Sequence, residues 1–373
     1  MRRHFVEHDD LDLFVATSGE FDEPGVASLR LLSPAWLKRI RSTRFWRLVQ
    51  NFEMLFWSER LPHDLVEAAE AFKPDAIFTV ADLSLSEAAR RLAHRLKVPL
   101  ITNFQDWWPL GQFYYAQERP YSFLVPLFEE RFRRLYRESS LAFCTSEGMR
   151  EFLGSHPNSH VLYPIGAREN ESVDHVPELK SNISGKRRLI YTGTAFGSYG
   201  EMLRSLAKEL RNSETWELII YGARPDWPAD ELAQAEQIGL YRGFLPFEKL
   251  KEELASADVC LAVMSFDPAL EVMMRTSFTT KLLDYCKAGK PIIMWGPEYC
   301  APVRMIKKQA AAWAITTPDA KEVVEALMKI REDFNLREDL SQGAKRLAKG
   351  DLSHDKIHGV FVEQITALIN KDD

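Results

Sequence analysis

Residues 279–296, with the sequence TTKLLDYCKAGKPIIMWG, decide the fold because they predict one helix, one glycine break and one buried strand. Leu283 and Cys286 belong to an apolar stripe with helical spacing. Gly289 and the proline that follows shortly after it end the helix and start an apolar strand at 292–295. A helix that leads directly into a buried strand is the repeating unit of a parallel α/β sheet.

The start of this helix gathers polar groups that suit a small anion. Thr279 and Thr280 supply hydroxyl groups, and Lys281 and Asp284 follow within two turns. The first amide groups of a helix have no partners within the helix and lie at the positive end of its dipole, so this position favours phosphate. An ordinary helix-to-strand unit with solvated charges explains the same pattern, and the local sequence leaves both readings open.

Length and composition indicate a two-domain cytoplasmic protein. The chain has 373 residues, enough for two domains that each bury a sheet between helices. Its net charge of -6 gives no general attraction to nucleic acid. The four cysteines lack metal-ligand spacing and read as reduced core residues. No apolar run reaches the roughly 18 residues needed to cross a bilayer, and the N-terminus lacks a signal-peptide pattern.

Short apolar runs alternate with helical segments along nearly the whole chain, which predicts two Rossmann-like, doubly wound parallel-sheet domains. Strands are predicted at 12–17, 76–80, 100–103, 142–145, 160–163, 188–192, 216–221, 240–244, 259–264, 291–295 and 312–316. Helices are predicted at 65–72, 85–96, 199–210, 246–255, 279–286, 321–334 and 356–370.

The expected division of the chain follows from a polar, aperiodic segment at 167–186, which reads as a linker. The N-terminal domain is then 1–166, the C-terminal domain 187–352, and a closing helical segment occupies 353–373. A doubly wound domain normally opens with a strand, a glycine-rich turn and a helix. Residues 1–10 instead read as a helix end leading into a strand, so the first domain is either atypical or lacks its first strand-helix unit.

A second candidate phosphate site follows the strand at 188–192. Gly193, Thr194, Gly197 and Ser198 form a glycine-rich turn at the start of the next helix, where backbone amides can approach a pyrophosphate. Glycines are also common in such turns for steric reasons alone, and their spacing here is not the dinucleotide fingerprint.

Arg224 lies on the loop after the next predicted strand, at the edge where open parallel sheets bind ligands. Its planar guanidinium could pair with a phosphate. A lone loop arginine is more often solvated. Arg224 is therefore a candidate phosphate-binding residue only in combination with the Gly193 loop and Lys281.

Four segments of the second half follow one another in a recognisable order: YTGTAFGSYGEML, LIIYGARP, LYRGFLPFEKLKEELASADVCLAVM and TTKLLDYCKAGKPIIMWGP. As a set they resemble the C-terminal domain of the family 4 nucleotide-sugar glycosyltransferases. In the first half, FKPDAIFTV, KVPLITNFQDWWP, LAFCTSEGMREFL and VLYPIG are similar to the N-terminal domain of that family. The closing segment SHDKIHGVFVEQI resembles the helix that crosses back to the N-terminal domain. The resemblance implies the GT-B architecture, two Rossmann-like domains facing a cleft.

The resemblance also implies roles for residues of the second domain. Family members carry two acidic residues eight positions apart, and the second binds the ribose of the nucleotide. Asp284 matches that second position, whereas Thr276 stands at the first. Lys281 matches a lysine that would neutralise the donor diphosphate. The Arg and Lys pair that many members place after the Gly193 loop is absent, which leaves this role to Arg224 or Lys281.

In the first domain, Asp106 follows a predicted strand and by resemblance faces the cleft as a catalytic residue. Relatives commonly carry a histidine beside this aspartate, where Gln105 stands here. Trp107 and Trp108 could stack on a sugar or lipid acceptor. The alternatives are an aspartate that caps the next turn and tryptophans that belong to the core.

Residues 36–57 contain five Lys and Arg residues interleaved with Trp36, Phe45 and Trp46. Such a segment can dock on an anionic membrane or a polyanionic acceptor, which predicts peripheral contact with the inner membrane face. A solvated helix face with buried aromatics is the alternative. His354 and His358 have the spacing of a metal pair, but no third ligand is evident, so no metal is expected.

The resemblance implies a glycosyltransferase that moves a sugar from a nucleotide-diphosphate sugar to a glycan or lipid-linked acceptor, as in polysaccharide biosynthesis. It further implies retention of the anomeric configuration, with no metal and no cofactor beyond the nucleotide-sugar. Lys281, Arg224 and the amides of residues 193–198 would stabilise the leaving diphosphate.

Two alternatives stay open from the sequence. A GT-B nucleotide-sugar epimerase would need several acidic and histidine residues in the cleft, and Asp106 has few such companions. A transferase-like binding protein that has lost its chemistry is motivated by Thr276 and Gln105, which replace a glutamate and a histidine of the family.

Overall fold

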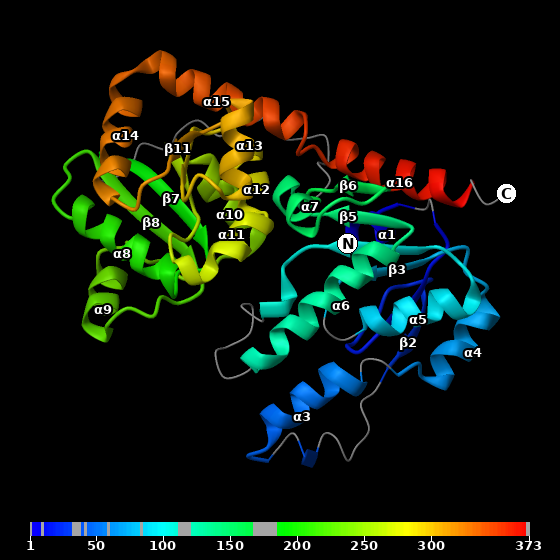
Figure 1. The fold of residues 1–373 in the computed structure, drawn as a ribbon. Helices are drawn as coiled ribbons and strands as arrows, with labels where there is room; N and C mark the ends of the chain where they lie inside the picture. Colours follow the sequence, from blue (N-terminus) through cyan, green and yellow to red (C-terminus); the bar gives the residue numbers. More distant parts are fainter. Residues whose placement is uncertain are drawn as a thin grey trace. The chain divides into compact units, whose positions relative to one another are not determined.

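The chain of this computed structural model divides into two compact units, drawn in Figure 1. Unit 1 comprises residues 1–163 and 358–373, and unit 2 comprises residues 164–357. The structure describes residues 2–8, 11–31, 39–40, 43–57, 60–82, 85–110, 121–166 and 185–370. Most of the predicted linker, residues 167–184, therefore lies outside the described residues. The predicted closing segment contains helix α16 (His354–Ile369), which begins in unit 2 and continues in unit 1.

Unit 2 is built on a five-stranded sheet in which neighbouring strands are parallel. Its strands are β7 (Arg187–Gly193), β8 (Trp216–Gly222), β9 (Val259–Val263), β10 (Ile292–Trp295) and β11 (Trp313–Ile315). They lie in the order β11-β10-β9-β7-β8. Every residue of β9 and β10 is buried, as expected for apolar runs in a sheet covered on both faces.

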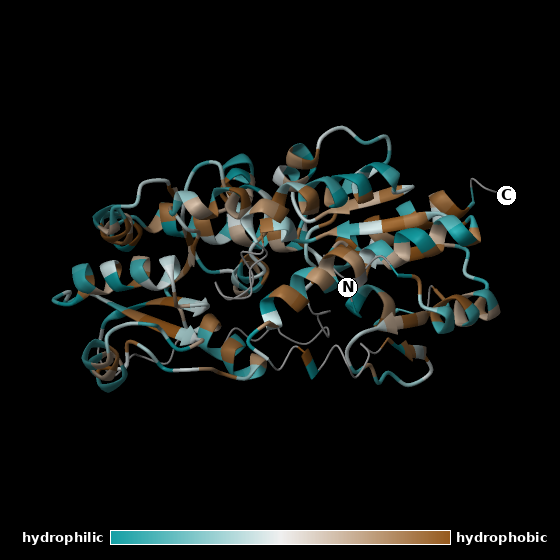
Figure 2. Ribbon diagram, turned by 60° about the horizontal axis from the view of Figure 1, so that its bottom comes forward, coloured by the Kyte–Doolittle hydropathy of each residue, from teal (hydrophilic) through white to brown (hydrophobic). Residues whose placement is uncertain are grey.

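Helices surround this sheet, and Figure 2 shows their alternation of hydrophilic and hydrophobic residues. They are α8 (Ser198–Leu210), α9 (Ala229–Gln237), α10 (Phe247–Ala255), α11 (Glu271–Thr276), α12 (Lys281–Ala288), α13 (Ala301–Gln309), α14 (Ala320–Glu332) and α15 (Phe334–Lys349). Helices α8, α9 and α14 share one core with strand residues such as Leu189 and Leu261. The alternate strand residues, such as Ile190 and Cys260, are equally buried, and α12 contacts β9 while α15 contacts β10.

The strand order of unit 2 reverses beside β7. Tyr241 forms an isolated parallel bridge with Ile220 of β8, so the strand predicted at 240–244 is reduced to one bridge. With Tyr241 beside β8, the sheet has the order of a doubly wound fold. The chain builds outward from β7 through β8 and then crosses to β9 on the other side. The carboxyl ends of β7 and β9 therefore flank the switch point, where such sheets bind ligands.

Unit 1 contains a four-stranded parallel sheet and a separate two-stranded one. The larger sheet consists, in this order, of β3 (Ile77–Val80), β4 (Leu100–Phe104), β5 (Leu141–Cys144) and β6 (Ser159–Val161). The smaller sheet pairs β1 (Phe14–Thr17) with β2 (Ala27–Arg30), which the sequence did not predict. The helices are α1 (Arg2–Val6), α3 (Trp46–Phe52) with its π-helical continuation η1 (Glu53–Trp57), α4 (His63–Phe72), α5 (Ser86–Leu96), α6 (Val125–Glu138) and α7 (Glu147–Leu153).

The N-terminal helix α1 belongs to the core of unit 1. The ring of Phe5 lies 5.2 Å from that of Phe78 on β3 and 5.1 Å from that of Phe361 on α16. His4 is only 2% exposed, and its Nδ1 lies 3.3 Å from Nδ1 of His358. Among the described residues, no helix is long and apolar enough to cross a bilayer.

Candidate functional site

Lys281 is the first residue of α12, and its side chain lies at the carboxyl end of β7. Its Nζ donates a hydrogen bond of 2.7 Å to the phenol oxygen of Tyr191. The ammonium also lies 4.4 Å from the ring centroid of Tyr191 and 5.8 Å from that of Tyr199. Because burial disfavours the charged amine, the pKa of Lys281 is lowered to about 8. A half-buried lysine with a lowered pKa at a switch point is a strong candidate for an anion-binding group.

Tyr191 positions this lysine from within the sheet. Its side chain is fully buried on β7, and its hydroxyl donates to the backbone carbonyl of Thr194 while it accepts from Lys281. Burial raises the pKa of Tyr191 well above its usual value, so the phenol stays neutral. A second buried phenol, on Tyr285, accepts a 2.9 Å bond from the amide of Thr192. Sequence reasoning missed both tyrosines, since an aromatic residue in an apolar run reads as core.

Gly193 ends β7 where only glycine fits. Its φ is 113°, and a Cβ there would lie 2.3 Å from Cε and 2.8 Å from Nζ of Lys281. Gly222 at the end of β8 is equally constrained, because its Cβ would lie 2.1 Å from the carbonyl oxygen of Gly193. The two glycines thus let two strand ends and one lysine side chain occupy the same small volume.

The head of α8 is braced by a carboxylate, which corrects part of the predicted phosphate site. The amide of Gly197 donates to Oδ2 of Asp226 at 2.9 Å, so it is not directed at a ligand in this structure. Trp227 beside it donates from Nε1 to the carbonyl of Gly200 at 2.9 Å. Ser198 at the first helical position has a buried Oγ with no hydrogen-bond partner among the described residues, so one polar group at this helix start is unsatisfied.

Arg224 is not brought to the lysine. Its side chain is 73% exposed, and the ion pair that it forms is a long one, 4.0 Å to Glu236 on α9. Within the described part of the chain, no hydrogen bond or ion pair joins it to Lys281 or to residues 193–198. The predicted cluster of Arg224, Lys281 and the glycine loop is therefore reduced to the lysine and the loop in this conformation.

The start of α12 presents its predicted polar groups. Thr280 occupies the N-cap position, is exposed, and makes no capping bond with its side chain. Asp284 lies in the first turn of the helix and is half-buried. Thr276 is fully buried, and its hydroxyl donates back to the carbonyl of Val272 at 2.8 Å. Thr276 therefore cannot replace a cleft-facing acidic residue.

In unit 1, Asp106 follows β4 and is half-buried, and its backbone carbonyl accepts a 3.1 Å bond from the amide of Trp108. Trp108 is half-buried in the 3-10 turn η2 (Trp108–Leu110). Trp107 is fully buried, with the rings of Phe132 and Phe152 at 5.1 and 4.7 Å. The prediction that Trp107 stacks on an acceptor is wrong for this conformation, because its faces are occupied by the core.

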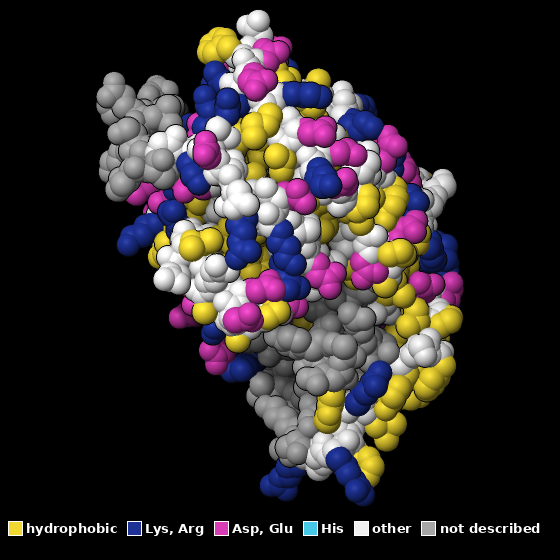
Figure 3. Space-filling view, turned by 90° about the vertical axis from the view of Figure 1, so that its left-hand side faces the viewer, with side chains coloured by type: hydrophobic (Ala, Val, Ile, Leu, Met, Phe, Trp, Pro, Cys, Tyr) yellow, Lys and Arg dark blue, Asp and Glu magenta, His cyan; other side chains and the backbone are white. Residues whose placement is uncertain are grey.

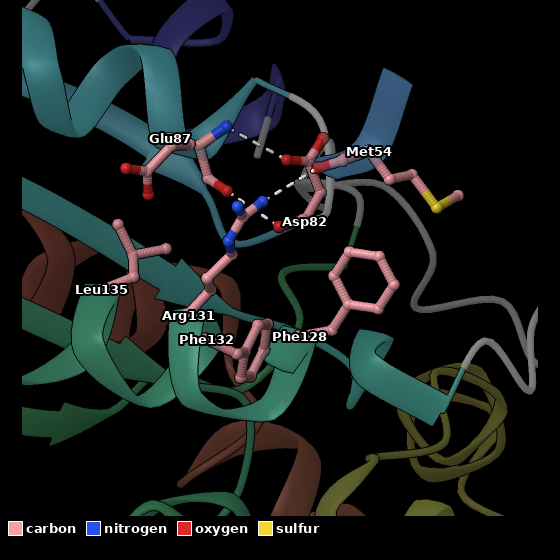
Figure 4. A pocket seen from close by; sticks show the side chains of 8 residues that line it. Met54, Asp82, Glu87, Phe128, Arg131, Phe132 and Leu135 are labelled. Atoms are coloured by element: carbon pink, nitrogen blue, oxygen red, sulfur yellow. Dashed lines mark hydrogen bonds between the residues drawn. The ribbon is translucent and has the colours of Figure 1, made fainter. Parts of the chain in front are cut away.

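A small cavity lies in unit 1 near the carboxyl end of β3 (Figure 4). The carboxylate of Asp82 accepts a 3.1 Å bond from the amide of Ser86, and Arg131 donates to the carbonyl of Met54 at 3.1 Å. The cavity measures about 20 Å³, which holds about one water molecule. It is a structural polar cluster, too small for a sugar. Sequence analysis did not single out these residues.

The described residues of the two units offer no metal site. No group of three or more His, Cys, Asp or Glu side chains in them is arranged to hold a metal ion. His354 and His358 lie on α16 as predicted, with His4 as the neighbour of His358.

Two family models match the sequence. The model described as "Glycosyl transferase 4-like domain" matches residues 10–163, and the one described as "Glycosyl transferases group 1" matches residues 186–333. A comparison with curated proteins found no match.

Solved structures similar to the chain include Anabaena Alr3699/HepE in complex with UDP and glucose, with a TM-score of 0.60 and 14% identity over 91% of this chain and 86% of that chain. A glycosyltransferase from Rickettsia africae has a TM-score of 0.64 and 10% identity over 95% and 90% of the two chains. WaaG, a glycosyltransferase involved in lipopolysaccharide biosynthesis, has a TM-score of 0.58 and 16% identity over 95% and 91%. These likenesses confirm the predicted fold, two Rossmann-like parallel-sheet units of the GT-B type.

Proposed function

Because the chain belongs to the group 1, family 4-like glycosyltransferases, whose two domain models together span most of it, we propose that unit 2 binds a nucleotide-diphosphate sugar and unit 1 the acceptor. Because both family models describe glycosyltransferases, the family favours a glycosyltransferase and not an epimerase. The observation that carries the assignment of the donor to unit 2 is the half-buried lysine at the switch point of its sheet, Lys281 beside the Gly193 loop.

The proposed role of Lys281 follows from the charge change in sugar transfer. The bond between the anomeric carbon and the diphosphate oxygen breaks while an acceptor hydroxyl attacks, and negative charge grows on the departing diphosphate. A half-buried ammonium, held by a neutral phenol, stabilises that charge more strongly than a fully solvated one would. We therefore propose that Lys281 supplies this stabilisation, with the amides of Gly193 and Thr194 beside it.

The remaining site assignments are proposals that rest on position. Asp284 lies one turn along α12 from Lys281, where its carboxylate would accept hydrogen bonds from the ribose. Asp106 lies at the carboxyl end of β4. Open parallel sheets bind their ligands at the carboxyl ends of the strands, so we place Asp106 on the ligand-binding side of unit 1. We propose transfer with retention and neutralisation of the diphosphate by protein groups, without a divalent cation.

The similar structures suggest where to begin the search for substrates. HepE was crystallised with UDP, with UDP-glucose, and with UDP and glucose, which makes a uridine donor the first candidate. WaaG acts in lipopolysaccharide biosynthesis, which favours a glycan or lipid-linked acceptor.

The proposed function is tested with a panel of uridine, guanosine, adenosine and thymidine diphosphate sugars. Selective thermal stabilisation identifies the base, and release of the free nucleoside diphosphate measures donor cleavage with and without EDTA. We expect one base to stabilise the protein and its sugar conjugate to be hydrolysed slowly, at an EDTA-independent rate. Stabilisation without any cleavage or transfer would instead support the binding protein without chemistry, and dependence on a divalent cation would overturn the proposed charge neutralisation.

A further inference from the structure

We propose that the outer face of α3 and η1 in unit 1 docks on an anionic lipid surface. Phe45, Leu48, Phe52 and Phe56 are 53, 58, 44 and 60% exposed. They succeed one another at intervals of three and four residues, which places them on one side of the helical segment. We call these four side chains the apolar face. Water-exposed phenylalanine and leucine in a continuous stripe are costly unless another surface covers them.

Other groups of the segment are anchored to unit 1, which fixes the exposed apolar face outward. Val49 and Asn51 are buried, and the side chain of Asn51 accepts a 3.1 Å bond from the amide of Tyr121. Arg131 of α6 donates to the backbone carbonyls of Met54 and its neighbour in η1 at 3.1 and 2.9 Å. These bonds hold the middle and the C-terminal part of the segment against unit 1.

The apolar face continues onto the neighbouring turn. Phe123 in the 3-10 turn η4 (Ser122–Leu124) is 75% exposed, and Leu127 at the start of α6 is 43% exposed. Tyr121 links the two parts, because its ring stacks on Phe123 at 5.5 Å and lies under the guanidinium of Arg47 at 4.7 Å. Figure 3 shows hydrophobic and basic side chains together at the lower end of the view, where Figure 1 places α3.

The charge around the apolar face selects the partner. The described residues 39–40 and 43–57 contain three arginines, Arg39, Arg44 and Arg47, and one acidic residue, Glu53, which is only 8% exposed. The guanidinium of Arg44 lies 5.0 Å from the ring of Phe45, at the edge of the apolar face. This basic edge belongs to a chain with a net charge of -6. A second copy of the chain would place arginines against arginines, whereas anionic headgroups complement them while the acyl region receives the phenylalanines.

The proposal is tested by flotation of the full chain with vesicles of phosphatidylcholine alone or mixed with phosphatidylglycerol. We expect binding to the mixed vesicles that decreases with salt, and little binding to phosphatidylcholine. Substitution of Phe45, Leu48 and Phe56 by serine should lower partitioning by at least about tenfold, because binding scales with the apolar area inserted. Arg44→Gln alone should lower it by about fivefold, on the mixed vesicles only.

The matched control replaces Ile238, Phe244 and Phe334 by serine, since these are one aliphatic and two phenylalanine side chains of unit 2 that are 66, 81 and 65% exposed. This variant should bind vesicles like the wild type. The proposal is overturned if the wild-type chain does not float with anionic vesicles, or if both triple variants lose binding equally. It is also overturned if the apolar face instead mediates self-association, seen as a mass increase by light scattering that the Phe45, Leu48 and Phe56 variant abolishes.

Discussion

Lys281 donates its 2.7 Å hydrogen bond to a phenol, Tyr191, rather than to a carboxylate. A carboxylate partner would neutralise the ammonium, whereas a phenol whose pKa is raised by burial leaves the positive charge uncompensated. The fold therefore holds the half-buried ammonium of Lys281 in place and leaves its charge for an anionic ligand. That arrangement weakens the ligand-free protein and prepares the site for a diphosphate.

The pH dependence of nucleotide binding should report this lysine. The pKa of Lys281 is lowered to about 8, so the amine of the free protein loses its charge as the pH rises through that value. Affinity for a nucleoside diphosphate should then fall by about tenfold per pH unit above about pH 8. Calorimetric titration of wild type and Lys281→Met across this range measures it, and the ratio of the two affinities removes the titration of the nucleotide itself. A ratio that does not change with pH would contradict a charged Lys281 in the complex.

Removal of the partly buried charge of Lys281 should stabilise the free protein. Since the folded-state pKa lies below the usual value of 10.5, folding disfavours the protonated amine. The penalty is fully present below about pH 8 and disappears as the pH rises towards the unfolded-state value, with an upper limit of about 3 kcal/mol. Lys281→Met should therefore raise the free energy of unfolding of the ligand-free chain at pH 7, measured by urea denaturation. A lower free energy of unfolding would mean that the amine is satisfied by other groups.

Tyr191→Phe separates positioning from packing. Loss of the hydroxyl removes the acceptor of the Lys281 bond and the donor to the Thr194 carbonyl, which should cost about 1–2 kcal/mol of stability. Because the ammonium loses its acceptor, the pH at which affinity falls should move lower. Tyr285→Phe is the matched control, since it removes a buried phenol that bonds Thr192. Tyr285→Phe should lower the free energy of unfolding about as much as Tyr191→Phe does, but it should not change the pH at which nucleotide affinity falls.

Gly193→Ala should reduce binding through Lys281. A methyl group there would lie 2.3 Å from Cε of Lys281, so the lysine must move away, whereas a methyl group at Gly197 would meet no atom within 4 Å. Both positions have positive φ, and alanine should destabilise each by about 1–3 kcal/mol. Only Gly193→Ala should weaken nucleotide binding by about tenfold or more. Equal losses in both variants would show that loop conformation, not lysine placement, controls affinity.

Asp226 should cap helix α8, although it lies on a different loop of the chain. Asp226→Ala leaves the Gly197 amide without its carboxylate partner and should lower the free energy of unfolding by about 1 kcal/mol. Asp226→Asn keeps an oxygen acceptor and should cost less. Thermal denaturation of both variants measures the difference, and an equal loss would argue that charge rather than the hydrogen bond is what matters there.

The sequence predicted the elements whose signals are local. Apolar runs bounded by glycine and proline predicted β7 to β11 to within a few residues, and Gly289 ends α12 in the left-handed conformation. The strand at 240–244 was over-predicted, because an edge position leaves only one bridge at Tyr241. Strand β2 was missed, and so were several helices, among them α6, α7, α9, α13 and α15.

The site was harder to predict because its contacts are not local. Lys281 was singled out from its helix start, but its partner Tyr191 lies 90 positions away in the chain. Asp226 was missed for the same reason, since its bond to Gly197 joins two different loops. Trp107 was placed near an acceptor because no local pattern separates a buried tryptophan from a stacking one, and only packing around Phe132 decides it.

The central claim is tested most directly by calorimetric titration of uridine diphosphate, or of the nucleoside diphosphate that the panel selects, into wild type, Lys281→Met and Lys290→Met at pH 7. Lys290 is the matched control, because it is also partly buried but precedes β10. It therefore lies near the amino ends of the strands, whereas Lys281 lies at their carboxyl ends. The account predicts a loss of about thirtyfold or more in Lys281→Met and a change within about twofold in Lys290→Met. Wild-type affinity in Lys281→Met, or an equal loss in both variants, would contradict it.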